Sequence, residues 1–387
     1  MHPLRTVARA PPTLSPVRDL FVLDPELVFL NHGSFGACPG AVLDEYQRIQ
    51  REIERNPVAA LSLYRGFPDA IARVRERLAA YVGADAADLV LVPNATTGVN
   101  LVARSLDLRP GDEVVSTTHE YGGNDLLWQW VCERRGARYI RVDTTPGRAV
   151  VELLGAVTER TRVLFLSHVS SPTALVFPVE EICRRAREAG VATLVDGAHA
   201  PGQIDLAVEA IGADWYAGNC HKWLCAPKGA GFLHVRRERQ SELEPVAVSW
   251  DWAVEEWADR HRWHGTRDPS PYLAVPAAIN FQKEHRWEDV RARCRSLASR
   301  ARRELSELLA TEPPAGEADE SGLLQMVTVR LPPCDAFALG ARLAAEHRIE
   351  VLAQEWRGRP ILRASFQGYN DEEDLRTLVA ALRRELL

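Results

Sequence analysis

The chain has 387 residues, of which 46% are hydrophobic and 26% are charged, a composition typical of a globular protein with one large and one smaller domain. Its formal net charge of −6 gives no reason to expect a nucleic acid or a membrane surface as partner, and no apolar run approaches the roughly 18 residues of a membrane span. The 7 cysteines form no CxxC pair, so we expect a reduced, cytoplasmic protein without a disulfide framework or a metal site.

The first part of the chain predicts an arm followed by two helices. Residues 1–20 contain four prolines, which predict an extended arm. A helix is expected between Pro39 and Pro57, because proline is tolerated at a helix start and not in its interior. Apolar residues spaced three to four apart then predict a second helix that ends at Gly83.

From residue 88 onward, strand-like apolar runs alternate with helical segments, which predicts a mostly parallel sheet covered by helices. The expected strands are 88–92, 113–116, 163–167 and 191–195, and the expected helices are 97–106, 124–135 and 179–189. Binding sites in such sheets lie outside the carboxyl ends of the strands. The segments that fall there are 93–97, 119–121, 168–173 and 196–199.

After about residue 270 this alternation ends. We expect one continuous helical stretch from Leu273 to about Leu309, followed by a break rich in proline and glycine at 313–316. A compact α+β unit follows, with strands at 324–331 and 361–366 and helices at 336–346 and 372–387. The predicted organisation is an N-terminal arm (1–20), a large domain (21–270) and a small C-terminal domain (271–387), which the arm joins.

Two segments predict the chemistry of the site. An apolar run ends directly in Asp196, as when a buried strand delivers a carboxylate to the rim of a sheet, and a lone lysine, Lys222, follows in a small-residue loop. This pair suits pyridoxal 5′-phosphate (PLP), because the lysine holds the aldehyde as a Schiff base and the aspartate keeps the pyridine nitrogen protonated. The alternative is an aspartate that caps a turn and a surface lysine.

Neighbouring segments are consistent with a phosphorylated, flat cofactor. The segment 94–98 follows a strand and opens a helix, so it is either a phosphate cradle or an ordinary helix cap. Tyr121, followed by two glycines, is either an aromatic that stacks on a ring or a core tyrosine. The segment 170–173 and His199 either reach the cofactor's phenolic oxygen or form turns and caps.

Eight short motifs occur in one order along the chain. They are Leu30-Asn-His-Gly-Ser-Phe-Gly36, Asn94-Ala-Thr-Thr-Gly98, His119-Glu-Tyr-Gly122, Ser167-His-Val-Ser170, Asp196-Gly-Ala-His199, Cys220-His-Lys-Trp223, Gly265-Thr-Arg-Asp-Pro-Ser270 and Arg363-Ala-Ser-Phe…Tyr369-Asn370. From about residue 25 to the C-terminus, the chain thereby resembles the class V aminotransferase family of PLP enzymes, and within it the isopenicillin N epimerase group. The resemblance implies an α/β fold of type I, with a mostly parallel sheet of the seven-stranded type in the large domain and a small α+β C-terminal domain.

The resemblance also implies roles for individual residues. Lys222 is the Schiff-base lysine, Asp196 pairs with the pyridinium nitrogen, and Tyr121 stacks on the ring. Arg363 corresponds to the arginine that binds the substrate α-carboxylate, for which its planar fork is suited. Thr266 lies in the segment that reaches the phosphate of the neighbouring subunit, which implies a homodimer with shared active sites. The expected cofactor-binding set is Ala95, Thr96, Thr97, Tyr121, Ser171, Thr173, Asp196, His199, His221, Lys222 and Thr266, and the expected substrate-binding set is Asn31, His32, Arg267 and Arg363. Arg267 either binds a distal acidic group of the substrate or has a structural role, as a pair with Asp268 or at a helix start.

The motifs leave the reaction open. Lys222 is the expected general base at Cα, and Tyr121, His32 and His264 are the candidates for a proton donor on the opposite face. The leading hypothesis is epimerisation or racemisation of an amino-acid-type substrate, with a C–S (β-elimination) lyase as the alternative and a transaminase as a lesser one. A non-catalytic PLP-binding protein is disfavoured, because a cofactor carrier has no need of Arg363.

Two further segments bear on this choice. Cysteine desulfurases carry a nucleophilic cysteine shortly before the carboxylate-binding arginine, whereas residues 352–362 contain none and Cys334 lies further upstream, so a persulfide-forming enzyme is disfavoured. Cys220 and Cys225 flank the lysine and are expected to be small packing residues. The tryptophan-rich segment 250–264 either lines the substrate entrance or packs between subunits.

Overall fold

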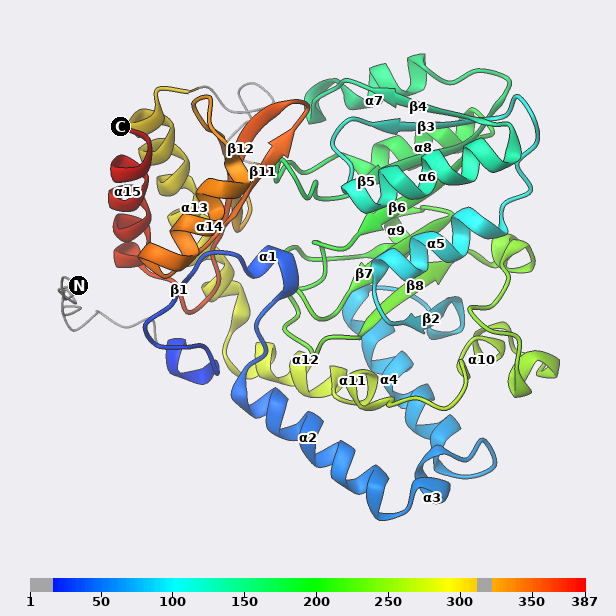
Figure 1. Cartoon of the computed structure of the whole chain (residues 1–387). Helices are drawn as coiled ribbons and strands as arrows, with labels where there is room; N and C mark the ends of the chain where they lie inside the picture. The colour runs from blue at the N-terminus through cyan, green and yellow to red at the C-terminus, as the bar shows by residue number, and fades with distance from the viewer. Residues whose placement is uncertain (1–16, 312–321) are drawn as a thin grey trace.

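The computed structural model describes residues 17–311 and 322–387. A seven-stranded sheet forms the larger body, with the strand order β2-β8-β7-β6-β5-β3-β4. Only β8 runs against its neighbours, and the other strands are parallel to one another, so the mostly parallel sheet expected from the sequence is confirmed (Figure 1). The strands are β2 (Leu89–Val92), β3 (Glu113–Thr117), β4 (Arg138–Val142), β5 (Thr161–Ser167), β6 (Ala192–Gly197), β7 (Trp215–Asn219) and β8 (Gly231–Val235).

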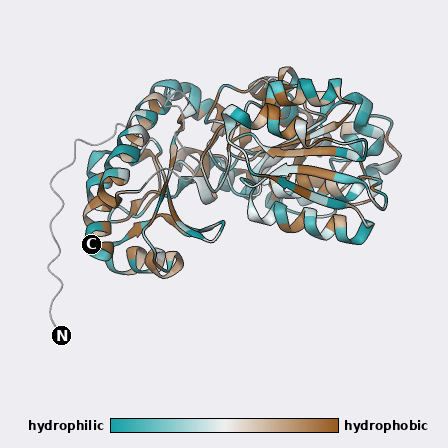
Figure 2. Ribbon diagram, turned by 90° about the horizontal axis from the view of Figure 1, so that it is seen from above, coloured by the Kyte–Doolittle hydropathy of each residue, from teal (hydrophilic) through white to brown (hydrophobic). Residues whose placement is uncertain are grey.

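Helices cover both faces of this sheet, and the side chains of β5 show how. Val163 and Phe165 belong to the hydrophobic cluster that includes α5 (Ala95–Ser105) and α6 (Gly122–Arg135). Leu164 and Leu166 point the other way, into the cluster that includes α7 (Pro146–Gly155) and α8 (Val179–Glu188). Figure 2 shows the result, with hydrophobic strands enclosed between helices whose outer sides are hydrophilic.

The N-terminal segment packs on both bodies. The helices α2 (Gly40–Arg55) and α4 (Gly66–Val82) confirm the two helices expected after Pro39, and Gly83 closes α4 in the left-handed conformation with φ of 67°. The short helices of the described residues up to 273 are α1 (His32–Phe35) and α3 (Pro57–Leu61) in the N-terminal segment, and α9 (Val208–Ile211), α10 (Trp257–Arg260) and α11 (Ser270–Leu273) further along the chain. Upstream, β1 (Val28–Phe29) pairs in parallel with β10 (Ile349–Glu350) of the C-terminal part.

The C-terminal part is an α+β unit. Its antiparallel sheet has the order β11-β12-β9 and consists of β11 (Leu352–Trp356), β12 (Arg359–Ser365) and β9 (Met326–Arg330). It is covered by α13 (Trp287–Leu309) and α14 (Ala336–His347), and α15 (Glu372–Leu386) packs against these two helices and β1. The domain boundaries expected from the sequence stay a prediction, and the break expected at 313–316 and most of the arm at 1–20 lie outside the described residues.

The single helix expected from Leu273 to about Leu309 is wrong. The chain forms α12 (Val275–Glu284) and then leaves the helix at Arg286, whose φ is 49°, before α13 begins. The break lets Trp287, which is only 5% exposed, pack against Phe281 with 5.4 Å between ring centroids. No proline or glycine marks this position, so the tertiary packing of Trp287 overrides the local helical pattern.

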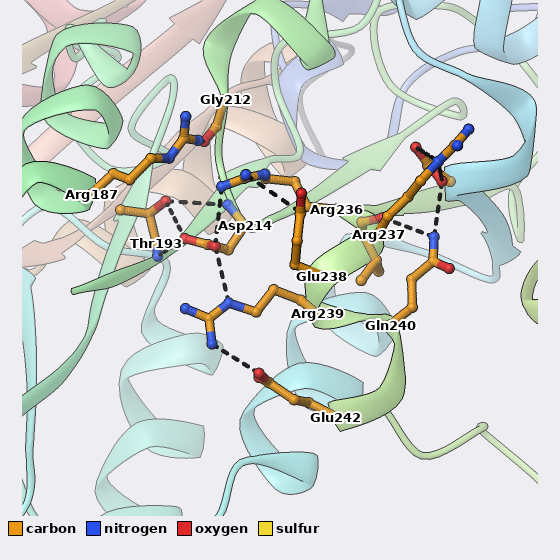
Figure 3. Close-up of polar contacts among 12 residues, drawn as sticks. Arg187, Thr193, Gly212, Asp214, Arg236, Arg237, Glu238, Arg239, Gln240 and Glu242 are labelled. Carbon is orange, nitrogen blue, oxygen red and sulfur yellow. Dashed lines mark hydrogen bonds and ion pairs between the residues drawn. The ribbon is translucent and has the colours of Figure 1, made fainter. Parts of the chain in front are cut away.

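A polar network holds the amino-terminal edge of the large sheet, opposite to the edge where parallel strands end (Figure 3). Asp214 precedes β7 and accepts hydrogen bonds from the backbone N–H of Thr193 at 2.8 Å and from Nε of Arg239 at 3.1 Å. Arg236 forms an ion pair with the same carboxylate. Within residues 17–311 and 322–387, no helix is both long enough and apolar enough to cross a membrane.

Candidate active site

A cavity of about 1090 Å³ opens at the carboxyl ends of the parallel strands. Its walls come from the residues that follow β2, β3, β5, β6 and β7, from α1, and from β11 and β12 of the C-terminal sheet. The expectation that the strand-end segments converge at one edge is therefore confirmed. The cavity lies at the upper end of the size range of ligand pockets, so it can hold a cofactor together with a substrate.

Lys222 projects into this cavity from the loop after β7. Its Nζ lies 3.1 Å from Nε2 of His199, whose Nδ1 lies 3.2 Å from the indole nitrogen of Trp223. The pKa of Lys222 is lowered to about 7, first by burial and then by the positive charge of Arg363, while the negative charge of Asp196 opposes both effects. With this pKa a large fraction of the amine, about half, is neutral at pH 7, and a neutral amine is a nucleophile toward a carbonyl group.

Asp196 lies at the end of β6 and is 5% exposed. Its Oδ2 accepts a hydrogen bond from Nδ2 of Asn124 at 2.7 Å, and its Oδ1 accepts one from the backbone N–H of Ala198 at 2.9 Å. Burial raises the pKa of this carboxyl, whereas the N–H of Ala198, the charge of Lys222 and the amide of Asn124 lower it. The carboxylate is therefore held in one orientation at the cavity wall.

The start of α5 is fixed beside the lysine loop. Asn94 caps the helix, because its Oδ1 accepts from the backbone N–H of Thr97 at 2.8 Å. Asn219, the last residue of β7, accepts from the backbone N–H of Ala95 at 2.7 Å. Thr96 between them lines the cavity, so the positive end of an eleven-residue helix faces it, as phosphate binding requires.

Arg363 comes from β12 and is 1% exposed. Its Nη1 donates to the carbonyl oxygen of Ser171 at 2.6 Å and its Nη2 donates to Oγ of Ser34 at 3.1 Å. Its Nε is buried without a hydrogen-bond partner, and no carboxylate within residues 17–311 and 322–387 pairs with the guanidinium. A buried, oriented guanidinium without an internal counter-charge is suited to bind a carboxylate from the cavity.

Tyr121 stands at the entrance to α6, lines the cavity and is 46% exposed. A side chain at Gly123 would place its Cβ 2.6 Å from Cε1 of the Tyr121 ring, so glycine is needed for the ring to lie where it does. Glu120, just before it, also lines the cavity and accepts hydrogen bonds from the hydroxyls of Thr117 at 2.6 Å and Ser167 at 2.7 Å. Burial raises the pKa of Glu120 to about 8.

The structure brings together eight of the residues expected in the site. The cavity is lined by Thr96, Tyr121, Ser171, Asp196, His199, His221, Lys222 and Arg363. Ser171 lies beside Arg363, to which it offers both its carbonyl oxygen and its Oγ. Sequence reasoning missed Ser34, Glu120 and Asn124 as residues of interest, although Asn124 lies three residues, about one helical turn, after Tyr121.

The other expected residues do not line the cavity. Ala95, Thr97 and Thr173 lie behind its wall, where Thr173 donates to Oγ of Ser170 at 2.8 Å. Asn31 accepts a hydrogen bond from Oγ of Ser34 at 2.6 Å and so supports the residue that contacts Arg363. His32 is fully buried and contacts the backbone oxygen of Lys222 at 3.0 Å, behind the lysine loop.

Neither Thr266 nor the tryptophan-rich segment lines the cavity of its own chain. Thr266 is exposed, and Cζ of Arg267 lies 4.4 Å above the ring of Tyr272. Trp250 and Trp252 are 76% and 48% exposed, and none of the tryptophans in 250–264 lines the cavity formed by the described residues.

No cysteine lines this cavity within residues 17–311 and 322–387. Cys220 and Cys225 are both fully buried, and burial raises the pKa of each thiol above its usual value. A buried neutral thiol is a small apolar packing residue and not a nucleophile.

The residues present fit PLP. The guanidinium of Arg363 and the amine of Lys222 lie at one cavity, with the carboxylate of Asp196 and the start of α5 in its wall. These groups match the carboxylate of a substrate and the aldehyde, ring nitrogen and phosphate of the cofactor. Lys222 would hold the aldehyde carbon, Asp196 the ring nitrogen, and Thr96 with His221 the phosphate.

Comparison with known proteins agrees with this fit. Residues 29–378 match the family Aminotransferase class-V. Isopenicillin N epimerase of Streptomyces clavuligerus is 38% identical over 391 residues, which cover 94% of this chain and 96% of that protein. A protein of Xylella fastidiosa named as a probable cysteine desulfurase is 27% identical over 375 residues, with 92% and 90% covered. The solved complex of the cystine C–S lyase C-DES with cysteine persulfide shares the fold, with a TM-score of 0.80, 24% identity and coverage of 93% and 98%.

Proposed function

The chain belongs to the class V aminotransferase family of PLP-dependent enzymes, and we propose that it inverts the configuration at Cα of an amino acid or of a substrate that contains one. The observation that carries this proposal is the placement of Arg363 without a counter-charge in the same cavity as Lys222 and Asp196. A cofactor-binding protein without catalysis has no need of a buried clamp for a carboxylate. The 38% identity to an epimerase over nearly the whole of both chains favours epimerisation among the reactions of the family.

Three side chains of the cavity, Asp196, Arg363 and Lys222, have separate roles in the proposed reaction. PLP, when bound, withdraws electrons from Cα of an attached amino acid and so acidifies its proton. Asp196 keeps a proton on the ring nitrogen through its negative charge, and Arg363 fixes the α-carboxylate and with it the face of Cα that meets Lys222. The free amine of Lys222 would be the base that removes the Cα proton with Nζ.

Inversion also needs a proton donor on the face opposite to Lys222. Tyr121 lines the cavity and carries a hydroxyl, so we assign it this role. His32 is unsuited because its Nε2 contacts the backbone oxygen of Lys222, and His264 because its Nε2 lies 2.8 Å from the backbone oxygen of His261.

A C–S lyase is the second candidate, because a protein of Oryza sativa subsp. japonica named as a putative L-cysteine desulfhydrase is 29% identical over 405 residues, which cover 92% of this chain. β-Elimination needs the same base and the same carboxylate clamp, and it needs no cysteine. A persulfide-forming reaction is disfavoured, since no cysteine of the described residues reaches the cavity. The products of the reaction separate the two candidates.

A homodimer with shared active sites is part of the proposal. Its support is that Thr266, which the family resemblance assigns to a phosphate, is exposed and does not line the cavity of its own chain, while Tyr64 and Trp250 are 88% and 76% exposed. Light scattering on the purified protein tests it, and a monomeric mass contradicts it. The cytoplasmic location expected from the cysteines stays a prediction.

The assignment of the lysine is tested by Lys222→Ala. The wild-type protein loaded with PLP is expected to show the visible absorbance band of a Schiff base, and the variant is expected to lack it. Lys283→Ala, which changes an exposed lysine of α12, is the matched control and keeps the band. A band that persists in Lys222→Ala shows that another amine binds the cofactor.

A further inference from the structure

Three residues form a relay of nitrogen atoms beneath the reactive amine. The indole Nε1 of Trp223 lies 3.2 Å from Nδ1 of His199, and Nε2 of the same imidazole lies 3.1 Å from Nζ of Lys222. Trp223 is fully buried and His199 is 2% exposed, so water does not compete for these contacts.

The chemistry of tryptophan fixes the protons in this relay. An indole N–H is only a donor, so Nδ1 of His199 accepts and carries no proton. Burial lowers the pKa of His199 well below 6.5, so the imidazole is neutral and its single proton resides on Nε2. Nε2–H then donates to Nζ of Lys222, which can accept only with the lone pair of a neutral amine.

We propose that Trp223 is a positioning residue that fixes the tautomer of His199 and thereby favours the neutral, nucleophilic amine of Lys222. The inference rests on the proposed function, because the readout is the capture of PLP by this amine. Trp223 does not line the cavity, so in this arrangement it acts through His199.

Other charged and titratable groups face Lys222 from the elements around it. They also influence the pKa of its amine, in addition to the effect of Trp223 through His199. The positive charge of Arg363 on β12 disfavours the ammonium, and the negative charge of Asp196 on β6 favours it. His221 and His32 are neutral at pH 7, because burial lowers their pKa values to about 4 and about 3. None of these groups dictates which nitrogen of His199 carries the proton, whereas the indole N–H does.

The test is the pH dependence of PLP capture by the full-length protein after its cofactor has been removed. The rate at which the Schiff-base band forms is expected to rise in the wild type with a midpoint near pH 7. In Trp223→Phe the imidazole can present a lone pair to the ammonium, so the midpoint is expected to rise by roughly one pH unit, the scale of one net hydrogen bond. An unmoved midpoint overturns the inference.

Trp128→Phe is the matched control, because Trp128 is also fully buried and its indole N–H has no hydrogen-bond partner within the described residues. This control is expected to leave the midpoint unchanged. In a His199→Leu background, Trp223→Phe is expected to cause no further shift, since the relay is already absent. An equal shift in that background assigns the effect to packing and overturns the inference.

A measurement on the wild type covers the case in which Trp223→Phe does not fold. Nitrogen-15 NMR of histidine-labelled protein, with the His199 signals assigned by their loss in His199→Leu, reports which ring nitrogen is protonated. Protonated Nε2 supports the inference, and protonated Nδ1 overturns it. If the wild type forms no Schiff-base band with PLP, the proposed function fails and this inference fails with it, whereas a band with an unmoved midpoint overturns this inference alone.

Discussion

Asn124 donates a hydrogen bond of 2.7 Å from its Nδ2 to Oδ2 of Asp196. Both side chains are buried, and Oδ1 of Asn124 has no hydrogen-bond partner in the part of the chain that the structure describes. An unpaired buried acceptor is costly, and the hydrogen bond to Asp196 offsets part of that cost. The contact ties the first turn of α6 to the end of β6 and favours the charged carboxyl that burial disfavours.

Asn124→Leu is therefore expected to weaken PLP binding. Loss of a hydrogen bond to a charged group costs about 1.5–3 kcal/mol, so the affinity for PLP is expected to fall by about tenfold or more. The affinity for a PLP analogue with CH in place of the ring nitrogen is expected to change little, because that analogue has no pyridinium for Asp196 to hold. Equilibrium titration of the apoprotein measures both.

The control for this pair of titrations is Gln129→Leu, which makes a similar change on the exposed side of the same helix. It is expected to bind both compounds as the wild type does. Equal losses of PLP and of the analogue in Asn124→Leu would mean that Asn124 only supports packing.

Arg363→Ala is expected to raise KM for the substrate by about tenfold or more, since a charged bidentate contact to a carboxylate is lost. The absorbance of bound PLP is expected to remain, because Arg363 serves the substrate. Steady-state kinetics with an absorbance spectrum of the same sample test this. Loss of the bound PLP with an unchanged KM would show that Arg363 binds the cofactor and not the substrate.

Glu120→Gln is expected to change how stability depends on pH. Burial raises the folded-state pKa of Glu120 from 4.5 to about 8, so between these values the folded protein retains a proton that the unfolded chain releases. The stability that this group contributes is fully present below pH 4.5 and is lost as the pH rises to 8. Glutamine stays neutral, so the variant is expected to gain stability relative to the wild type from about pH 5 to about pH 8 in urea unfolding. A constant difference across this range contradicts a raised pKa.

Asp214→Ala is expected to lower the free energy of unfolding by roughly 1–3 kcal/mol, because it leaves the buried N–H of Thr193 without an acceptor. The network of Figure 3 lies at the amino-terminal edge of the sheet, so the Schiff-base band is expected to be unchanged. Denaturant unfolding and a spectrum check the two parts. Loss of the Schiff-base band with an unchanged free energy of unfolding would show that Asp214 affects the active site directly.

Strand ends explain why so much of the site could be predicted. Asp196 follows an apolar run directly, and parallel strands bring all such positions to one edge, so the cavity followed from the order of the elements. The same reasoning missed β4, an edge strand with exposed arginines, and β7, whose Gly218 and Asn219 have low strand propensity.

Contacts between distant elements could not be predicted. Asn124 and Asp196 are 72 positions apart, and Arg363 meets Ser34 over a separation of 329, so no local pattern reports either contact. The break at Arg286 likewise depends on where Trp287 finds its partners. These arrangements are set by tertiary packing, which the hydrophobic periodicity and the secondary-structure propensity of the sequence do not encode.

Proton exchange tests most directly whether this PLP enzyme inverts the configuration at Cα. The loaded enzyme is incubated with a panel of amino acids in D₂O, Cα is followed by NMR, and the products are separated by chiral chromatography. Deuterium at Cα with inversion, without a keto acid, ammonia or a sulfur species, is the predicted result. Release of a keto acid with ammonia or of a sulfur fragment, without inversion, would contradict the account and place the protein among the lyases.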